Sequence, residues 1–289
     1  MMHSISIMTK FIFLNGRIIP DTEGSVSTDD RGFLYGDGIY ETLRSYDGKP
    51  FKLAEHLERM RHSAKQLRIL FEYTNTEISE IIKTLIDKNN IQDAYIRITL
   101  SRGAGGGRLQ MDDNIEPTTL IQVKPFSPYD SKLYDEGMTL VVSDYRRSTT
   151  CPISHYKTTN LLKSILLKEE AKTKSAHEAI ILNTDSYVAE CVVSNIFMVS
   201  GGSVITPSLD TNILPGITRI TVLDICKNKS IPISENHFTT DRLIKANEVF
   251  ITNSLMEIMP VSKIDNYKIG KVIPGMITQQ VMSAYKRLI

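Results

Sequence analysis

The chain has 289 residues, a length that favours one or two domains, and 41% of the residues are hydrophobic, which is enough to bury a sizeable core. Lys and Arg (34) nearly balance Asp and Glu (33), so the formal net charge of +1 provides no overall field that would draw the chain to nucleic acid or to an anionic membrane. The three cysteines, Cys151, Cys191 and Cys226, form no CxxC pair and no even disulfide framework, which favours a reducing compartment such as the cytoplasm.

The N-terminal residues MMHSISIMTK contain no long apolar core of the kind that a signal peptide requires. No apolar run elsewhere in the sequence approaches the ~20 residues needed to span a bilayer. We therefore expect neither export nor membrane insertion. Met8 is an alternative start to Met1, because the strand-like sequence FIFLNGRII begins directly behind it.

The first half of the chain alternates between strand and helix patterns. Residues 11–19 predict a β-hairpin whose two-residue turn is Asn15-Gly16, a dipeptide typical of such turns. Apolar residues at helical spacing predict helices over 52–70 and 78–86. Strand-like apolar runs are expected at 94–101, 118–124 and 138–143.

The second half continues this mixture after a segment at 124–133, which contains two prolines and several polar residues and is interpreted as a linker. Further strands are expected at 177–182, 195–200, 203–207 and 248–253, and helices at 158–173, 217–228 and 273–287. The pattern predicts a mixed α/β (α+β) fold with a small N-terminal domain, residues 1–123, and a larger C-terminal domain, residues 134–289.

Lys157 stands in SHYKTTNLL, between an irregular segment and a predicted helix. Most lysines in such a place are exposed to solvent and take part in no chemistry. A lysine held in a cleft can instead act as a Schiff-base nucleophile, which requires partial burial and a lowered pKa. The residues around Lys157 allow both interpretations.

Glu190 lies in the apolar run VAECVVSNIFMV. A carboxylate in such a run is costly unless it has a partner or faces water at a sheet edge. If it is buried, it is suited to pair with a cationic ring nitrogen such as that of a pyridinium cofactor. Asn195, five residues further on, is either a turn residue or a donor that supports this carboxylate.

The sequence ILPGITR places a Pro215-Gly216 turn before a predicted helix, and the free N–H groups and dipole of a helix N-terminus bind anions. The Thr218 hydroxyl can add a donor, as can Arg59 through a bidentate contact and Ser254 at the end of a strand. Pro215-Gly216 can equally be an ordinary turn before a helix that binds no anion. Arg59 can equally be a solvated arginine on the polar face of its helix.

The glycine-rich residues 101–108 (SRGAGGGR) have neither the GK[ST] ending of a P-loop nor the GxGxxG spacing of a dinucleotide site. We therefore expect a flexible loop that carries Arg102 and Arg108 toward a carboxylate. Tyr95 and Arg97 are two residues apart on a predicted strand and share a face, which we expect to line a cleft. The six histidines show no metal-binding spacing, and no Ser-His-Asp arrangement stands out.

Taken together, these motifs resemble the class IV aminotransferase family, the fold-type IV enzymes that use pyridoxal 5′-phosphate. The resemblance runs nearly from end to end, and eight strings carry it in family order: LNGRII, YGDGIYETLR, HLERM, YKTTNLL, EAIILN, VAECVVSNIF, ILPGITR and TNSLMEIMPV. It implies a two-domain enzyme whose active site lies between the domains and is completed by a loop from the second subunit of a homodimer.

The resemblance implies cofactor roles position by position. Lys157 matches the lysine that forms the Schiff base with the cofactor and then moves protons, and Glu190 matches the carboxylate that keeps the pyridine nitrogen protonated. Asn195 matches a supporting asparagine. The residues that match the cup for the cofactor phosphate are Arg59, the backbone N–H groups of Ile217 and Thr218, and Ser254.

The resemblance also implies where the substrate binds. Tyr95 and Arg97 are similar to the Tyr-x-Arg strand that helps to receive the substrate carboxylate in branched-chain aminotransferases. The full set of expected substrate-binding residues is Tyr35, Tyr40, Tyr95, Arg97, Arg108, Leu255 and Met256. No metal ion is expected in this site.

Departures from each pattern leave three activities open. Leu161 replaces a tyrosine that is usual in branched-chain aminotransferases, and TNS at 252–254 and ETLR at 41–44 replace their GTA and EGIR. A leucine at this position resembles the pattern of D-amino-acid aminotransferases. The loop after the predicted strand 94–101, however, lacks the histidine that those enzymes have there. TNSL, ETLR and the RGxGG loop are similar to aminodeoxychorismate lyases, which release pyruvate and 4-aminobenzoate.

We predict an enzyme that moves an amino group between a small α-amino acid and a 2-oxo acid such as 2-oxoglutarate, with branched-chain L-amino acids favoured. The Tyr95-x-Arg97 pair carries this choice. Aminodeoxychorismate lyase and D-amino-acid aminotransferase are the alternatives.

Overall fold

A computed structural model describes residues 10–111 and 115–289 of the chain. Met8, the alternative start, lies outside the described residues. Contacts divide the chain into two compact units: unit 1 is Met1–Ser127 with Lys157–Asn160, and unit 2 is Pro128–Tyr156 with Leu161–Ile289. In these described ranges, no helix is both long enough and apolar enough to cross a membrane.

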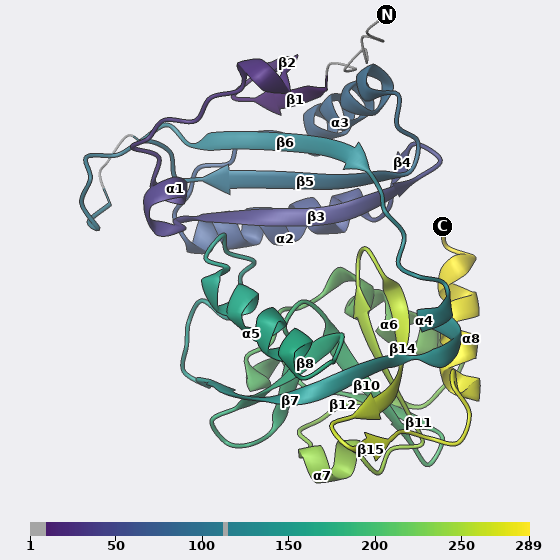
Figure 1. Cartoon of the computed structure of the whole chain (residues 1–289). Helices are drawn as coiled ribbons and strands as arrows, with labels where there is room; N and C mark the ends of the chain where they lie inside the picture. The colour runs from purple at the N-terminus through teal and green to yellow at the C-terminus, as the bar shows by residue number, and fades with distance from the viewer. Residues whose placement is uncertain (1–9, 112–114) are drawn as a thin grey trace, which may run out of the picture. The chain divides into compact units, whose positions relative to one another are not determined.

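Unit 1 contains, in its described part, a six-stranded antiparallel sheet with strand order β2-β1-β6-β5-β3-β4 (Figure 1). The strands are β1 (Phe11–Leu14), β2 (Arg17–Pro20), β3 (Gly38–Tyr46), β4 (Lys49–Pro50), β5 (Ala94–Ser101) and β6 (Thr118–Pro125). The helices are α1 (Arg31–Tyr35), α2 (Leu53–Gln66) and α3 (Asn75–Asn89). The predicted hairpin is confirmed, because Leu14 pairs with Arg17 and the two turn residues have positive φ, as a type I′ turn requires.

The core of unit 1 lies between the sheet and the helices α2 and α3. Alternate residues of β5 are buried in it, including Ile96 and Ile98, whereas Tyr95 and Arg97 lie on the opposite face and are half-buried. Leu57 of α2 is fully buried against the inner face. The sheet therefore has one apolar face and one face on which polar side chains are available for chemistry.

Unit 2 contains a nine-stranded mixed sheet in the described residues, with the path β12-β11-β10-β13-β14-β7-β8-β9 and β15 paired to β14. The strands are β7 (Met138–Arg147), β8 (Glu178–Asn183), β9 (Val188–Cys191), β10 (Asn195–Ser200), β11 (Ser203–Thr206), β12 (Ile233–Glu235), β13 (Glu248–Asn253), β14 (Glu257–Ile264) and β15 (Tyr267–Lys268). The helices are α4 (Lys132–Glu136), α5 (Leu162–Thr173), α6 (Ile217–Asn228), α7 (Thr240–Leu243) and α8 (Met276–Lys286).

Strands β8, β10 and β13 are buried along almost their whole length, which explains their continuous apolar sequences. Helix α5 contacts β7 and β8, whereas α6 and α8 contact β13. The rings of Phe197 and Phe250 stack with their centres 4.8 Å apart between neighbouring strands. Strand β10 begins at Asn195, and its register partner Thr252 lies near the end of β13; both residues belong to the candidate site in unit 2.

The prediction of a helix over 158–173 is wrong at its start, because α5 begins only at Leu162. Residues 157–159 instead pair with β3, as the bridge between Thr158 and Ile39 shows. The unit boundary after Ser127 falls inside the segment 124–133 that was interpreted as a linker. Unlike the expected domain 134–289, unit 2 does not include Lys157, because long-range backbone pairing places this residue in unit 1.

Candidate active site

Lys157 is held against the start of β3 by main-chain hydrogen bonds. The Tyr40 N–H donates to the Lys157 carbonyl oxygen over 2.9 Å, and the Thr159 N–H donates to the Gly38 carbonyl oxygen over 2.9 Å. A Cβ at Gly38 would lie only 2.8 Å from the Leu100 carbonyl oxygen and 3.2 Å from Thr159 Oγ1, so this close approach needs glycine. The backbone of Lys157 is therefore fixed by the sheet.

The polar face of the sheet brings together the predicted substrate residues around Lys157. Tyr40, Tyr95 and Arg97 share this face in the register of β3 with β5. The guanidinium carbon of Arg97 lies 3.8 Å from the centre of the Tyr40 ring, and Lys157 Nζ lies 4.4 Å from the same centre. Two cations thus contact one aromatic ring. We call these four residues the Lys157 face.

Arg59, on α2, is bound by the buried carboxylate of Glu41 on β3. Arg59 Nε donates to Glu41 Oε1 over 2.8 Å and Nη2 donates to Oε2 over 2.6 Å, while His56 Nδ1 lies 2.7 Å from Oε2. We call these three residues the Glu41 cluster. Burial raises the pKa of Glu41, but Arg59 and His56 outweigh burial and lower this pKa to about 2. An ionised carboxylate therefore fixes the orientation of the predicted phosphate-binding arginine.

His56 is the neutral member of the Glu41 cluster. Burial lowers its pKa below the ordinary value of 6.5, and the attraction of Glu41 offsets that effect only in part. The positive charges of Arg59 and Lys157 lower the pKa further. At neutral pH the cluster therefore pairs one carboxylate with one guanidinium and leaves the imidazole as an uncharged hydrogen-bonding group.

Glu190, on β9 in unit 2, is buried with both carboxylate oxygens hydrogen-bonded. Arg147 Nη1 donates to Oε1 over 2.5 Å. Asn195 Nδ2 and the Leu214 N–H donate to Oε2 over 3.0 and 3.1 Å. Because its residue is only 8% exposed, this carboxylate does not face water as an edge-strand residue would. We call Arg147, Glu190, Asn195 and Leu214 the Glu190 cluster.

Arg147 is the cation that offsets the burial of Glu190. It also donates to the Asn212 carbonyl oxygen over 2.9 Å, and its Nε is buried without a hydrogen-bond partner in the described residues. Removing one member of a buried ion pair typically costs roughly 3–5 kcal/mol, because the other charge is left uncompensated. The carboxylate of Glu190 is thus kept in place by a pairing that the sequence did not reveal.

The predicted anion site at the start of α6 lies beside the Glu190 cluster. Gly216 is the N-cap, and no side chain among the described residues caps the first turn, where a helix cannot satisfy its own N–H groups. A Cβ at Gly216 would lie 2.0 Å from Asn195 Oδ1, so only glycine allows the helix to begin here. Thr252, the register partner of Asn195, has a buried hydroxyl with no hydrogen-bond partner in the described residues. This donor set fits a phosphate group.

The remaining predicted residues lie mainly on turns. Tyr35 ends α1, and Arg108 is exposed on the glycine-rich loop. Ser254 and Leu255 form the turn between β13 and β14 and are half-buried. The side chain of Met256 packs in the apolar core of unit 2 and is only 2% exposed, so any contact with substrate would need that core to rearrange.

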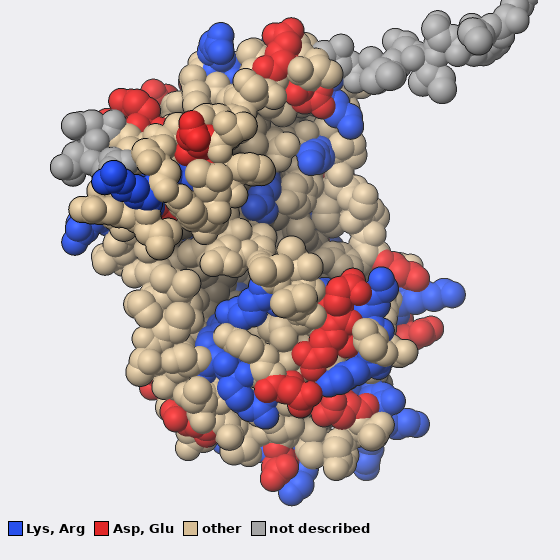
Figure 2. Space-filling model, turned by 60° about the vertical axis from the view of Figure 1, so that its left-hand side comes forward, with Lys and Arg blue, Asp and Glu red and all other residues tan. Residues whose placement is uncertain are grey.

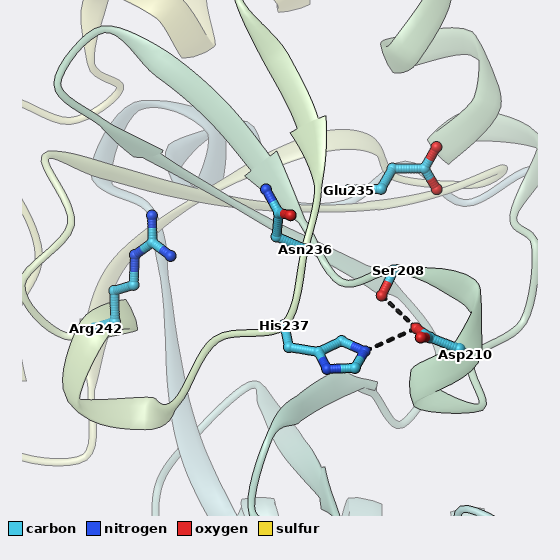
Figure 3. Close-up of a pocket in the computed structure, with 6 residues that line it drawn as sticks. All are labelled: Ser208, Asp210, Glu235, Asn236, His237 and Arg242. Atoms are coloured by element: carbon cyan, nitrogen blue, oxygen red, sulfur yellow. Dashed lines mark hydrogen bonds and ion pairs between the residues drawn. The ribbon is translucent and has the colours of Figure 1, made fainter.

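A separate hollow of about 690 Å³ lies on unit 2 and contains none of the predicted site residues (Figure 3). Ser208 and His237 both hydrogen-bond to the same oxygen of Asp210, and the His237 contact is 2.8 Å. Among the described residues that line it, serine and histidine make no contact with each other, so the group lacks the nucleophile–base pair of a catalytic triad. The hollow is shallow and polar and is not the candidate active site.

No surface of a single sign of charge marks a site on the face of the molecule shown in Figure 2. Basic and acidic side chains are interspersed on the face shown in Figure 2, in keeping with the near-zero net charge. Across residues 10–111 and 115–289, no three His, Cys, Asp or Glu side chains are grouped so that they could hold a metal ion. The chemistry must therefore be sought in the local clusters described above.

Sequence reasoning missed Arg147, Glu41 and His56 as members of these clusters. Arg147 lies after the predicted strand 138–143, in the charged sequence DYRR. This sequence continues strand β7, and a charged residue at the end of a buried strand was the available signal for a buried partner. Glu41 occupies a buried position of the alternating strand β3, where an acid requires a cationic partner. Their partners are many residues away in the sequence and only the fold identifies them.

A comparison with protein families matches residues 38–264 to the family described as amino-transferase class IV. This match covers more than half of the chain. The chain belongs to the class IV aminotransferase family, whose members are enzymes that depend on pyridoxal 5′-phosphate, and it has their mixed α/β fold.

Curated relatives span nearly the whole chain and carry three different names. A D-alanine aminotransferase of Bacillus licheniformis is 33% identical over 278 residues, which are 96% of each chain. A putative branched-chain-amino-acid aminotransferase of Methanocaldococcus jannaschii is 35% identical over 276 residues, or 95% of each chain. An aminodeoxychorismate lyase of Bacillus subtilis is 33% identical over 278 residues, or 96% of this chain and 94% of the relative.

A solved structure supports the same family. A branched-chain amino acid aminotransferase of the organism abbreviated T.th., described with pyridoxamine 5′-phosphate, matches with a TM-score of 0.90 and 30% identity over 96% of this chain and 93% of that chain. Because relatives of all three activities are about equally similar, the comparisons establish the family and leave the substrate open.

The Glu41 cluster should produce an acid-sensitive contribution to the stability of unit 1. The folded-state pKa values of Glu41 and His56 are both lowered, from 4.5 to about 2 and from 6.5, so the unfolded chain binds more protons on acidification. The contribution of His56 should decline below pH 6.5, and that of Glu41 should be lost between pH 4.5 and 2. In urea unfolding followed at several pH values, Glu41→Gln should flatten the loss below pH 4.5.

Glu58→Gln is the matched control, because Glu58 is exposed on the same helix α2. This variant should retain the pH dependence of the unaltered protein. Equal slopes for Glu41→Gln and the unaltered protein below pH 4.5 would contradict the role of Glu41.

Proposed function

We propose that the chain is a pyridoxal-phosphate-dependent transaminase that moves an amino group between a small α-amino acid and a 2-oxo acid such as 2-oxoglutarate, with branched-chain L-amino acids as favoured donors. The observation that carries the proposal is the Lys157 face. Lys157 and Arg97 contact the same Tyr40 ring, so their separation cannot exceed the sum of 4.4 and 3.8 Å. An α-amino acid has its amino and carboxylate groups on one carbon, and this spacing of an amine and a guanidinium suits it.

The cofactor proposed for this site is pyridoxal 5′-phosphate, which supplies an electron-accepting ring and an aldehyde that a lysine amine can join as a Schiff base. We propose that Lys157 provides this amine and that Glu190 faces the ring nitrogen. The uncapped start of α6, with the N–H groups of Ile217 and Thr218, together with the unsatisfied Thr252 hydroxyl, supports a phosphate site in unit 2. Arg59 and Ser254 complete the proposed phosphate-binding set.

Proton transfer is the second proposed role of Lys157. Its backbone is fixed by the pairing with β3, so its side chain always starts from the same point on the polar face. Arg97 and Tyr95 are proposed to bind the substrate carboxylate from the same face, and Tyr35, Tyr40, Arg108 and Leu255 are proposed as further members of the substrate set. Met256 belongs to this set only through its backbone, because its side chain packs in the core.

Two other activities compete for the same residues. Aminodeoxychorismate lyase would use the same cofactor and lysine, and the TNS turn at 252–254 and the glycine-rich loop favour it. D-amino-acid aminotransferase is favoured by Leu161, which stands half-buried just before α5. All three activities would use Lys157 and Glu190 in the same way, so the cofactor chemistry cannot separate them.

We further propose that the chain acts as a homodimer in the cytoplasm. The three cysteines form no disulfide, which suits a reducing compartment. Phe33 and Leu34 on α1 and Leu109 and Met111 on the neighbouring loop are all large, apolar and exposed, and a cluster of this kind supports an interface with a second copy. Arg31, which joins α1 to that loop, keeps the four side chains on one part of unit 1.

Substitutions of Lys157 and of Glu190 should impair cofactor binding and turnover in different ways. Lys157→Ala should abolish the yellow absorbance of the bound cofactor and lower turnover by roughly 10²–10⁴-fold, because both the covalent link and the proton carrier are lost. Glu190→Gln should retain bound cofactor but lose most of its turnover. Absorbance spectra, equilibrium dialysis of the cofactor and steady-state rates measure these quantities.

Lys172→Ala and Glu169→Gln, both exposed on α5, are the matched controls and should behave as the unaltered protein. Full activity with an intact yellow band in Lys157→Ala would refute the cofactor assignment.

The substrate class should follow from half-reactions that watch the same absorbance band. L-Leucine should bleach the band, because its carboxylate can reach Arg97 while its amine meets the Lys157 position. D-Alanine and aminodeoxychorismate are tested in parallel. Bleaching by D-alanine alone would contradict the branched-chain preference, and release of pyruvate from aminodeoxychorismate without an amino acceptor would favour the lyase.

The dimer should be visible as a particle of twice 32.6 kDa in multi-angle light scattering. Phe33→Asp should shift the population toward single chains, because it places a charge in the exposed apolar cluster. Val272→Asp, at another strongly exposed position in a loop of unit 2, should not. A single-chain mass for the unaltered protein at all concentrations would exclude the dimer.

A further inference from the structure

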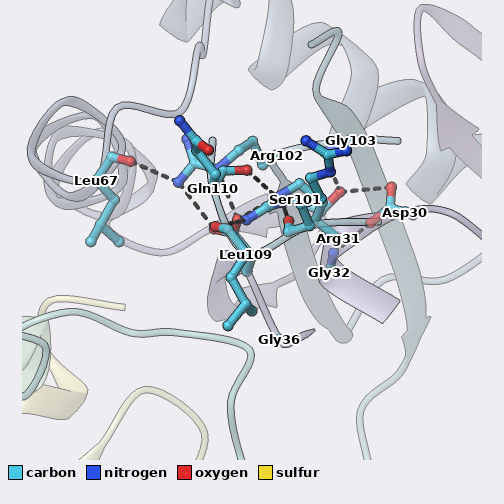
Figure 4. A network of polar contacts seen from close by, with 12 residues as sticks. Asp30, Arg31, Gly32, Gly36, Leu67, Ser101, Arg102, Gly103, Leu109 and Gln110 are labelled. Carbon is cyan, nitrogen blue, oxygen red and sulfur yellow. Dashed lines mark hydrogen bonds and ion pairs between the residues drawn. The ribbon is translucent and has the colours of Figure 1, made fainter. Parts of the chain in front are cut away.

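The guanidinium of Arg31 holds three successive carbonyl groups of the glycine-rich loop (Figure 4). Nη1 donates to the carbonyl oxygens of Arg108 and Gln110 over 2.5 and 3.3 Å, and Nη2 donates to that of Leu109 over 3.1 Å. Arg31 itself is buried at the start of α1. The loop thus curls around a single buried cation.

Asp37 joins Arg31 to a second buried arginine, Arg102. Its Oδ2 accepts hydrogen bonds from Arg31 Nε and Arg102 Nε, each over 2.8 Å, and its Oδ1 accepts from Arg102 Nη2 over 3.0 Å. Burial raises the pKa of Asp37, but the two arginines outweigh burial and lower it. One ionised carboxylate therefore sets the orientation of both guanidinium groups.

Arg102 also ties this network to the end of α2. Its Nη1 donates to the Arg68 carbonyl oxygen over 2.7 Å and its Nη2 donates to the Leu67 carbonyl oxygen over 2.9 Å. The loop is consequently fixed to a helix that packs in the core of unit 1. A guanidinium is suited to such a junction because its donors lie in one plane and point in several directions.

All the contacts that hold the loop at residues 108–110 through Arg31 involve backbone oxygens. The side chains of Arg108, Leu109 and Gln110 are exposed, and Leu109 is 78% exposed. Carbonyl groups are the same for every residue type, so these three side chains can change without loss of the anchor. Three consecutive glycines precede them, a sequence that would be free to adopt many conformations if the anchor were absent.

We propose that Arg31, Asp37 and Arg102 are positioning residues that clamp the backbone of residues 108–110, so that Arg108 and Gln110 are presented as exchangeable recognition groups for the substrate. The recognition part rests on the proposed function, in which Arg108 belongs to the substrate set. The clamp itself depends only on the contacts of Arg31, Asp37 and Arg102.

Trypsin provides a direct test of the clamp, because it cleaves after Arg108 and must extract the carbonyl group that Arg31 Nη1 holds. Asp37→Asn should increase the rate of cleavage at Arg108 about tenfold, since a charged hydrogen-bond acceptor of both arginines is weakened. Arg31→Lys, which keeps the charge but cannot span three carbonyls, should act in the same direction. Mass spectrometry of the 1–108 and 109–289 fragments measures the rate.

Asp93→Asn is the matched control, because Asp93 pairs with Arg44 over 3.8 Å elsewhere in unit 1. It should leave cleavage at Arg108 unchanged. Arg108→Lys retains a trypsin site, and Asp37→Asn should accelerate cleavage after this lysine by the same factor, because the side chain at position 108 takes no part in the clamp. Unchanged cleavage in a folded Asp37→Asn protein, judged by its thermal unfolding midpoint, would overturn the clamp.

The recognition role has its own readout. Asp37→Asn and Arg108→Ala should both raise KM for the amino donor more than they lower kcat, and they should leave cofactor affinity in equilibrium dialysis unchanged. Faster cleavage combined with an unaltered KM in both variants would overturn the recognition role of the loop. If the proposed transamination is wrong, Lys157→Ala should instead retain unaltered activity. That outcome has no bearing on the trypsin result.

Discussion

The structure depends above all on the short backbone pairing between residues 157–159 and the start of β3. The chain leaves unit 2 for four residues, forms two main-chain hydrogen bonds with Tyr40 and Gly38, and then returns to begin α5. Glycine at position 38 makes the approach possible, because any Cβ there would collide with the neighbouring strand. The pairing places Lys157 on the same polar face as Tyr95 and Arg97, and without it the lysine would be an ordinary residue of a connecting segment.

The second organising constraint is electrostatic, since Glu190, Arg59 and Asp37 are each held by a fixed opposite charge. Glu190 has Arg147, Arg59 has Glu41, and Asp37 serves two arginines. Such pairs contribute little net stability compared with apolar packing, but they impose one geometry because a misplaced partner leaves a charge uncompensated.

Local signals in the sequence predicted the hairpin at Asn15-Gly16, the strand at 94–101 and the helix at 217–228, because turn chemistry and apolar period act over few residues. The helix start at 158 was predicted wrongly for the converse reason: residues 157–160 are governed by hydrogen bonds to a strand more than a hundred residues away. The partners of Glu190 and Arg59 were missed for the same reason, because they lie far away in the sequence. Arg147 and Glu190, for example, are separated by 43 residues. Motifs can indicate that a carboxylate or an arginine matters, but only the fold shows which charge holds it.

The residues proposed to hold the cofactor are separate from those that differ between the three activities. This separation explains why relatives with three different activities are about equally similar to the chain. Lys157, Glu190 and the start of α6, which are proposed for cofactor chemistry, are held by backbone pairing, by an ion pair and by a tight glycine contact, so substitution there would damage the site itself. The residues that differ between the activities, Leu161, the turn at 252–254 and the loop at 108–110, lie outside regular elements except for the last residues of β13. At residues 108–110 the anchor uses only carbonyl groups, which places no demand on side-chain identity. Substrate preference can therefore change through exposed side chains while the arrangement that supports the chemistry stays the same.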